Sequence, residues 1–220
     1  MKNSFLIIAI FFSLIIFAQT AKEIIDKNIE VSGGLTNWKL LNSVIIYGNV
    51  TLGINDEYPI KIYQQRPNLT KTVLTINKKE TAIEGFDGKK GYAMNYAANK
   101  LQEYPNYNPE SFDNDFIEWE NKGFEAKYLG KEKIGDIYCH KVELTKNVNK
   151  TVYYFDVKNY MLLREIKKEE TLNYSDYKQV GSLLMPFRIE SSSPKKDSDY
   201  VISIYKIDTN KVFPANIFKF

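Results

Sequence analysis

The stretch Ser43–Gln65 reads SVIIYGNVTLGINDEYPIKIYQQ, and its hydrophobic pattern decides the fold class. Apolar residues recur at every second position on both sides of the Gly53–Glu57 turn, which is the period of a half-buried β-strand. Val44, Ile46, Val50 and Leu52 share one face of the first run, and Tyr58, Ile60 and Ile62 share one face of the second. Two such runs joined by a glycine-containing turn predict an antiparallel pair.

The same period continues along the chain. Turn signals such as Asp87-Gly88, Gly135-Asp136 and Gly181-Ser182 separate the runs. Further candidate strands are Leu69–Ile76, Thr81–Asp87, Gly91–Asn95, Ala126–Ile134, Tyr138–Thr145, Thr151–Asp156, Met161–Lys168, Glu170–Val180, Leu184–Ser191 and Tyr200–Asp208. Short strands joined by short turns, without a βαβ rhythm, predict a mainly β protein built as an antiparallel meander of about ten or eleven strands. A sheet of that size curls strongly.

Helical signals precede the strands. Thr20–Ser32 has an apolar stripe at helical spacing, and Thr20 and Glu23 have the spacing of a capping box. Glycine adopts the left-handed conformation at little cost, so Gly33 is expected to end this helix. Thr36–Leu41, which carries Trp38, predicts a short second helix.

One segment interrupts the strands. Phe112, Phe116 and Trp119 fall at positions i, i+4 and i+7, with Ser111 able to cap the start and Gly123 the end. This spacing predicts a short amphipathic helix.

The first residues have the pattern of a cleaved secretory signal peptide. Lys2 precedes the apolar run Phe5–Ala18, which is shorter than the ~20 residues of a spanning helix. Cleavage after Ala18 would leave a single domain over residues 19–220. Cleavage after Ala21 and a retained N-terminal anchor remain alternatives.

Composition and motif searches exclude several function classes. The chain has 220 residues, 44% of them hydrophobic, and a net charge of +3 without a basic stripe, which argues against a disordered chain and against nucleic-acid binding. One cysteine and one histidine exclude an intrachain disulfide and a zinc site built from several such residues. Neighbouring residues of a strand point to opposite faces, so Cys139 and His140 are not expected to form a catalytic dyad; a buried cysteine beside a partly exposed histidine is expected.

Two further motifs give no site. Asp113, Asp115, Glu118 and Glu120 are expected to form a solvated helix face, because the stretch lacks the internal glycine of a calcium loop. The glycines and lysines of residues 85–91 lack the spacing of a phosphate loop and predict a hairpin turn. We therefore expect no enzyme activity, no metal and no cofactor. A hydrolase with a dispersed carboxylate pair remains an alternative, because folding brings distant residues together.

The amount of apolar sheet is the informative feature. A curled sheet with one apolar face must cover that face, and few helices are available to do so. The pattern leaves two possibilities open, a tightly filled core and a hydrophobic pocket for an acyl chain or a similar ligand.

Several stretches, taken in order, resemble the outer-membrane lipoprotein-sorting (LolA-like) family in its Bacteroidetes-type form. They are EIIDKNIEVSGG at residues 23–34, FDGKKGYAMN at 86–95, YLGKEKIG at 128–135, YYFD at 153–156, YSDYKQVG at 174–181 and MPFRIE at 185–190. The resemblance implies an unclosed, curved antiparallel β-barrel with an N-terminal helix and short lid helices on its concave face. It also implies a monomeric periplasmic carrier that holds the acyl chains of lipoproteins, or another lipid, between an inner-membrane release complex and an outer-membrane acceptor.

The candidate cavity lining follows from the inward face of the first two strands and from the helices. It comprises Ile25, Ile29, Trp38, Val44, Ile46, Val50, Ile60, Ile62, Phe112, Phe116 and Trp119. For each residue, core packing is an alternative to ligand contact. An envelope sensor or scaffold on the same fold, without lipid transport, is the alternative function.

Overall fold

The computed structural model describes residues 20–53, 56–105, 107, 109, 111–194 and 199–220. The expected signal peptide, residues 1–18, lies outside this part of the chain. The described helices and strands are α1 (Ala21–Val31), α2 (Leu35–Leu40), β1 (Ser43–Leu52), β2 (Asp56–Gln65), β3 (Leu69–Ile76), β4 (Lys79–Phe86), β5 (Gly91–Asn95), β6 (Lys100–Tyr104), β7 (Glu125–Ile134), β8 (Ile137–Lys146), β9 (Asn149–Asp156), β10 (Leu162–Ile166), β11 (Thr171–Val180), β12 (Leu183–Ser192) and β13 (Tyr200–Thr209).

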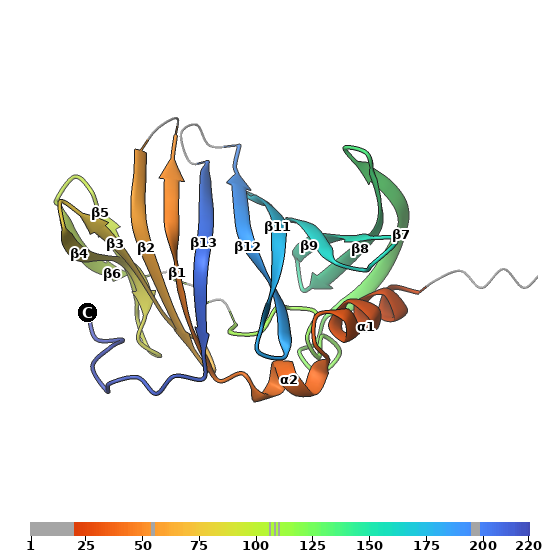
Figure 1. Ribbon diagram of the computed structural model, residues 1–220, viewed down its shortest axis with the longest axis horizontal. Coiled ribbons are helices and arrows are strands. Elements are labelled where there is room, and N and C mark those ends of the chain that lie inside the picture. The colour runs from red at the N-terminus through yellow and green to blue at the C-terminus, as the bar shows by residue number, and fades with distance from the viewer. Residues whose placement is uncertain (1–19, 54–55, 106, 108, 110, 195–198) are drawn as a thin grey trace, which may run out of the picture.

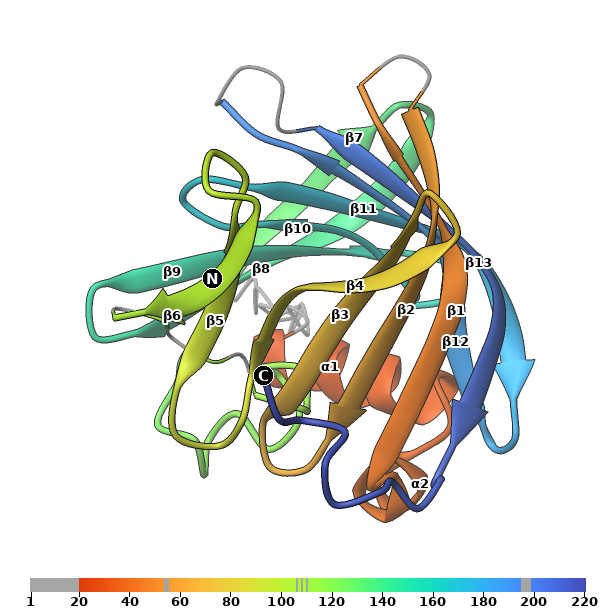
Figure 2. The same cartoon turned by 90° about the vertical axis from the view of Figure 1, so that its left-hand side faces the viewer.

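All strands belong to one antiparallel sheet in the order β6-β5-β4-β3-β2-β1-β13-β12-β11-β10-β9-β8-β7. Two meanders, β1 to β6 and β7 to β13, join where β1 pairs with β13 in a register that places Val50 opposite Ile202. The ends of the sheet, β6 and β7, do not pair with each other, so the barrel stays open (Figure 1). The sheet curves around α1 (Figure 2), which confirms the predicted unclosed antiparallel barrel.

Among the described residues the sheet has 13 strands, more than the predicted ten or eleven. One additional strand is β6, which lies outside the candidate strands named from the sequence. Its alternation is weak, with a single apolar residue between polar neighbours, so the strand depends on its pairing with β5.

Helix α1 begins as its sequence predicts. The Thr20 hydroxyl accepts a hydrogen bond from the Glu23 amide, and the Glu23 carboxylate accepts one from the Thr20 amide. Gly33 follows the helix with φ of +123° and lies so close to the β11–β12 turn that an added Cβ would sit 2.3 Å from the Ser182 carbonyl oxygen. The glycine therefore permits both the turn into α2 and its contact with the sheet.

The predicted helix near Phe112 does not form. Residues 115–123 are a series of turns, and the Phe112 amide donates to the carbonyl of Pro67 instead of joining a helix. Glu118 has φ of +53°, which a continuing α-helix does not allow. The apolar spacing is nonetheless used, because Phe116 is buried. We call residues 111–124 the lid segment.

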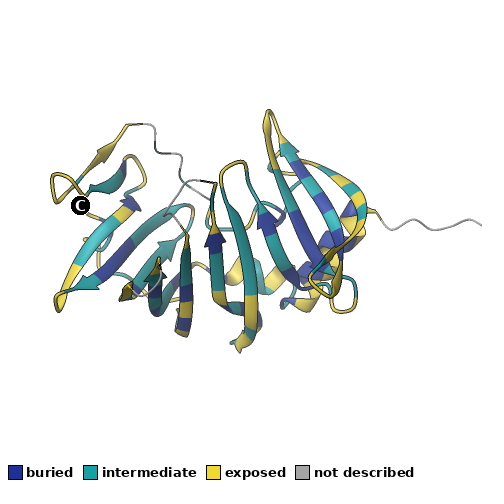
Figure 3. Cartoon of the chain, turned by 90° about the horizontal axis from the view of Figure 1, so that it is seen from above, coloured by how far each residue is buried: buried dark blue, intermediate teal, exposed yellow. Residues whose placement is uncertain are grey.

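The described residues form three apolar clusters, the smallest of which comprises Leu41, Val44, Leu183 and Met185. The two larger clusters divide the inner face of the sheet. The first, beneath α1, packs Ile24 and Ile25 against Val142, Leu144 and Phe155, all fully buried. The second lies on the wall formed by β1, β2, β3, β12 and β13, where buried side chains alternate with partly exposed ones (Figure 3). One half of the barrel is thus filled by a helix, and the other half presents an apolar wall that no described helix covers.

Candidate functional site

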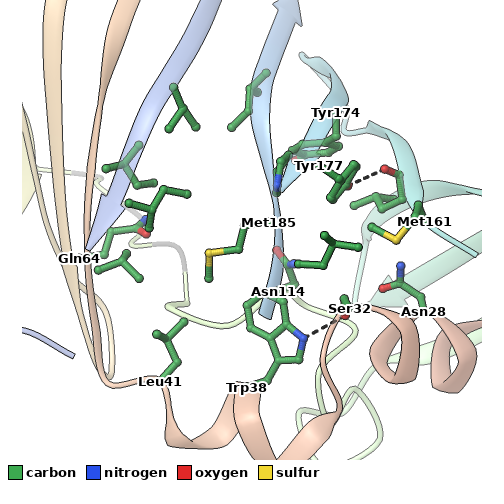
Figure 4. A pocket seen from close by; sticks show the side chains of 18 of the residues that line it. Asn28, Ser32, Trp38, Leu41, Gln64, Asn114, Met161, Tyr174, Tyr177 and Met185 are labelled. Atoms are coloured by element: carbon green, nitrogen blue, oxygen red, sulfur yellow. Dashed lines mark hydrogen bonds between the residues drawn. The ribbon is translucent and has the colours of Figure 1, made fainter. Parts of the chain in front are cut away.

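A cavity of about 210 Å³ lies between α2, the lid segment and the middle of the sheet (Figure 4). The sheet supplies Val44 and Ile46 from β1, Met185 and Ile189 from β12, and Ile204 and Ile207 from β13. Helix α1 supplies Asn28, and Ser32 directly follows it; helix α2 supplies Trp38, and Leu41 directly follows it. The lid segment supplies Phe112 and Phe116. Ile46, Ile189, Ile204 and Ile207 also pack against or belong to the second cluster, so the cavity is continuous with the apolar wall.

No acidic or basic side chain lines the cavity among the residues that the structure describes. Tyr174 and Tyr177 do line it, but both hydroxyls already donate hydrogen bonds within the protein. The Tyr174 hydroxyl donates to the Glu165 carboxylate at 2.8 Å, and the Tyr177 hydroxyl donates to the Leu162 carbonyl at 2.6 Å. Burial raises the pKa of both phenols far above the ordinary value, so both stay neutral. An apolar, uncharged lining suits a hydrocarbon ligand and disfavours an ion.

Arg66 fastens the lid. Its guanidinium donates to both carboxylate oxygens of Asp113 in the lid segment, one of them at 2.6 Å, and it stacks on the Phe112 ring. The same side chain donates to the carbonyls of Leu41 at 2.6 Å and of Trp38 at 2.9 Å. One side chain at the end of β2 therefore joins α2 and the lid segment to the sheet.

The α1–α2 corner is tied to the other side of the cavity. Trp38 donates its indole N–H to the Ser32 hydroxyl at 3.0 Å, and the Leu184 amide donates to the Ser32 carbonyl at 2.9 Å. The Asn28 side chain donates to the Tyr160 carbonyl at 2.7 Å. These bonds engage the Asn28 amide group and the Ser32 hydroxyl, which belong to residues that line the cavity.

The structure places the predicted lining residues in three settings. Trp38, Val44, Ile46, Phe112 and Phe116 line the cavity. Ile25 and Ile29 belong to the filled cluster beneath α1, and Trp119 packs against it. Val50 and Ile60 are buried in the second cluster, with Ile62 packed against them.

Several lining residues were not predicted. They come from strands late in the chain or, for Met161, from the residue before β10: Met161, Met185, Tyr174, Ile189, Ile204 and Ile207. Their alternation is visible in the sequence, but the face that they share with Val44 depends on the pairing of β1 with β13. Arg66 was also missed, because its partner Asp113 is 47 residues away.

The predicted exposure of His140 is wrong. Its side chain is 1% exposed, stacks on Tyr160 with ring centroids 5.5 Å apart, and has its Nδ1 3.2 Å from the Tyr128 hydroxyl. Burial lowers the pKa of His140, Lys131 lowers it further, and Asp156 opposes them. Cys139 is fully buried, as expected. Since alternation sends the two side chains to opposite faces, no dyad forms.

The buried histidine predicts a pH dependence of stability. The unfolded chain, whose histidine titrates near its ordinary pKa of about 6.5, takes up a proton that folded His140 resists. The free energy of unfolding will therefore be fully retained above that pKa and will fall as the pH drops from about 7 to about 5.5. Urea unfolding across this range measures the slope. His140 is the chain's single histidine, so His140→Phe should remove the slope; a slope that persists in this variant would contradict the assignment.

Neither metal ligation nor a membrane-spanning helix is visible in the described ranges. Among those residues, no group of three or more His, Cys, Asp or Glu side chains could hold a metal ion. Within the same ranges, no helix has the length and apolar character to cross a membrane. The acidic residues near the lid make ion pairs instead, such as Glu118 with Lys39 at 2.7 Å.

Solved structures share this architecture over most of their length. A LolA superfamily protein from Nitrosomonas europaea is 15% identical with a TM-score of 0.57, and the match covers 92% of this chain and 98% of that one. An outer membrane lipoprotein-sorting protein domain from Vibrio parahaemolyticus is 11% identical with a TM-score of 0.58, covering 90% and 95%. A DUF1329 family protein from Desulfovibrio piger is 11% identical with a TM-score of 0.61, covering 92% and 98%.

Comparisons with protein-family models and with curated proteins give no match. The chain therefore has the fold of LolA-like and lipoprotein-sorting proteins, and this likeness, at low sequence identity, is one of architecture.

Proposed function

We propose that this protein is a periplasmic carrier that binds the acyl chains of lipoproteins, or of another lipid, and shields them during transfer towards the outer membrane. The observation that carries this proposal is the uncharged apolar cavity beneath the lid, continuous with an apolar wall. The fold likeness to a lipoprotein-sorting domain supports the same class of cargo.

The energetics favour such a role. Each buried methylene of an acyl chain contributes ~0.8 kcal/mol, so a chain of about sixteen carbons gains on the order of 10 kcal/mol when it leaves water. A cavity that holds the chain needs no catalytic group. The hydrolase alternative loses support, since no carboxylate lines the cavity among the residues that the structure describes.

The size of the cavity indicates that the lid must move. An apolar cavity of roughly 150 Å³ holds a benzene molecule, whereas pockets that enclose whole drug-sized ligands span roughly 300–1,000 Å³. At about 210 Å³, the cavity has room for part of an acyl chain. A complete chain would extend along the apolar wall after the lid segment and α2 withdraw.

The proposed partners follow from this role. The carrier would take its cargo from an inner-membrane release complex and pass it to an outer-membrane acceptor, and it would act as a monomer. The signal-like first residues support export across the inner membrane.

A filled cavity tests the proposal. Val44 is 5% exposed and lines the cavity, so Val44→Trp places an indole where the cargo would lie. Wild-type protein should bind a fluorescent acyl probe saturably, and Val44→Trp should weaken that binding about tenfold or more. Val148→Trp is the matched control, because Val148 is 92% exposed in a turn and its replacement should leave binding unchanged. Equal binding by all three proteins would contradict the proposal.

A further inference from the structure

The polar side chains around the cavity are not equivalent. Asn28 and Ser32 are committed to hydrogen bonds within the protein. The carboxamides of Gln64 and Asn114 also line the cavity. Neither makes a side-chain hydrogen bond to any residue that the structure describes. Gln64 is half-buried and Asn114 is exposed. These two groups can offer both a donor and an acceptor to a ligand.

The two carboxamides belong to segments that Arg66 joins. Gln64 lies on β2 two residues before Arg66, which directly follows the last residue of that strand. Asn114 directly follows Asp113, the carboxylate that Arg66 binds in the lid segment. Figure 4 shows both carboxamides among the side chains that surround the cavity. They therefore contribute polar groups from the sheet side and from the lid side of the same space.

Their chemistry selects among acyl ligands. A carboxamide N–H donates well to an ester or amide carbonyl, and its oxygen accepts from an amide N–H or a glyceryl hydroxyl. A free fatty acid would instead bring a carboxylate into a lining that contains no basic side chain among the described residues. The cations beside the two carboxamides are already engaged, since Arg66 binds Asp113 and Lys122 donates to the Asn114 carbonyl. Burying an unpaired carboxylate is costly, whereas burying a hydrogen-bonded carbonyl is not.

We propose that Gln64 and Asn114 form a subsite for the carbonyl linkage of an ester- or amide-linked acyl chain. The cargo is then an acyl chain attached through a neutral linkage, and free fatty acids are disfavoured. This inference rests on the proposed function and specifies the substrate class of the same cavity.

Three ligands with the same chain length test the subsite. They are 1-lauroylglycerol, which has the ester carbonyl, 1-O-dodecylglycerol, in which an ether replaces it, and laurate, which is ionised at pH 8. Displacement of a fluorescent acyl probe from wild-type protein should show the ester binding about tenfold more tightly than the ether, as expected for hydrogen bonds to one carbonyl. Laurate should bind more weakly than the ester.

Variants assign that preference to the two carboxamides. Gln64→Leu with Asn114→Leu should bring the ester-to-ether ratio close to one while the ether retains its affinity. Gln65→Leu is the matched control, because Gln65 is the next residue on β2 and alternation places its side chain on the opposite face. This control should keep the wild-type ratio. Gln64→Met and Asn114→Ser, made singly, provide milder changes if the double variant is unstable.

The outcomes separate this inference from the proposed function. Equal binding of ester and ether by wild-type protein, or an unchanged ratio in the variants, would overturn the subsite and leave the carrier role standing. Tighter binding of laurate than of the ester would also overturn it. Failure of all three ligands to displace the probe, or failure of the probe to bind, would overturn the carrier role itself.

Discussion

Replacement of Arg66 by leucine will lower the free energy of unfolding by about 2–3 kcal/mol and will loosen the lid. The change removes the guanidinium that binds Asp113, whose side chain is 15% exposed, and leaves a largely buried carboxylate without its cation. It also removes the donors to the Leu41 and Trp38 carbonyls. Urea unfolding measures the loss of unfolding free energy. Stopped-flow fluorescence measures the rate at which the acyl probe enters the cavity, and we expect this rate to rise because the lid segment opens more readily.

Two further variants test whether the loss of stability comes from the specific contacts of the Arg66 guanidinium. Arg66→Lys keeps the charge but lacks the planar fork that reaches several acceptors, so it should recover less than half of the lost stability. Arg188→Leu removes an arginine whose pair with Glu190 is 44% and 45% exposed, and it should cost less than about 0.5 kcal/mol. An Arg66→Leu protein as stable as wild type, with unchanged probe entry, would contradict the role given to Arg66.

Ile25→Ala will cost about 3 kcal/mol of unfolding free energy without changing the affinity for an acyl probe. Ile25 is fully buried in the cluster beneath α1, and truncation leaves an unfilled space there. Phe116 and Leu162 of that cluster reach the cavity, but Ile25 itself does not line it. Chemical unfolding and probe titration on the same preparation separate the two effects.

Ile46 is the matched residue, because it is also an isoleucine predicted from the sequence to line the pocket, and it does line the cavity. It is only partly buried, so Ile46→Ala should cost about 1 kcal/mol in stability, yet it should weaken probe binding severalfold through lost contact. Equal loss of binding in the two variants would show that the division between filled and hollow halves is wrong.

Local patterns predicted most of the elements. The capping box of Thr20 and Glu23, the glycine after α1 and the period-two runs around Ser43–Gln65 each act over a few residues, and the structure uses them as expected. These signals are determined by backbone hydrogen bonding and alternation, which neighbouring residues can specify by themselves.

Contacts between distant segments were not predictable in the same way. The lid segment has helical apolar spacing, but the bond from the Phe112 amide to Pro67 and the Arg66–Asp113 pair hold it in turns. Tertiary contacts therefore override its helical tendency. For the same reason, His140 was expected to be partly exposed: its strand shows alternation, but nothing local indicates that Tyr128 and Tyr160 cover it.

The cavity lining shows most clearly which contacts the sequence could not predict. Val44 and Ile46 were identified because they lie on the inward face of an early strand, whereas Ile204 and Ile207 became neighbours of that face only when β13 paired with β1. This pairing closes a loop of most of the chain, and no short-range signal encodes it. The lining is thus a property of topology as much as of hydrophobic pattern.

The most direct test of the central claim is lipid extraction and mass spectrometry of the protein purified from its native envelope without detergent, with Val44→Trp purified in parallel. The account predicts that wild-type protein carries ester- or amide-linked acyl lipid in near-stoichiometric amount and that the variant carries little. Wild-type protein that repeatedly emerges free of lipid, or a variant that carries as much as wild type, would contradict it.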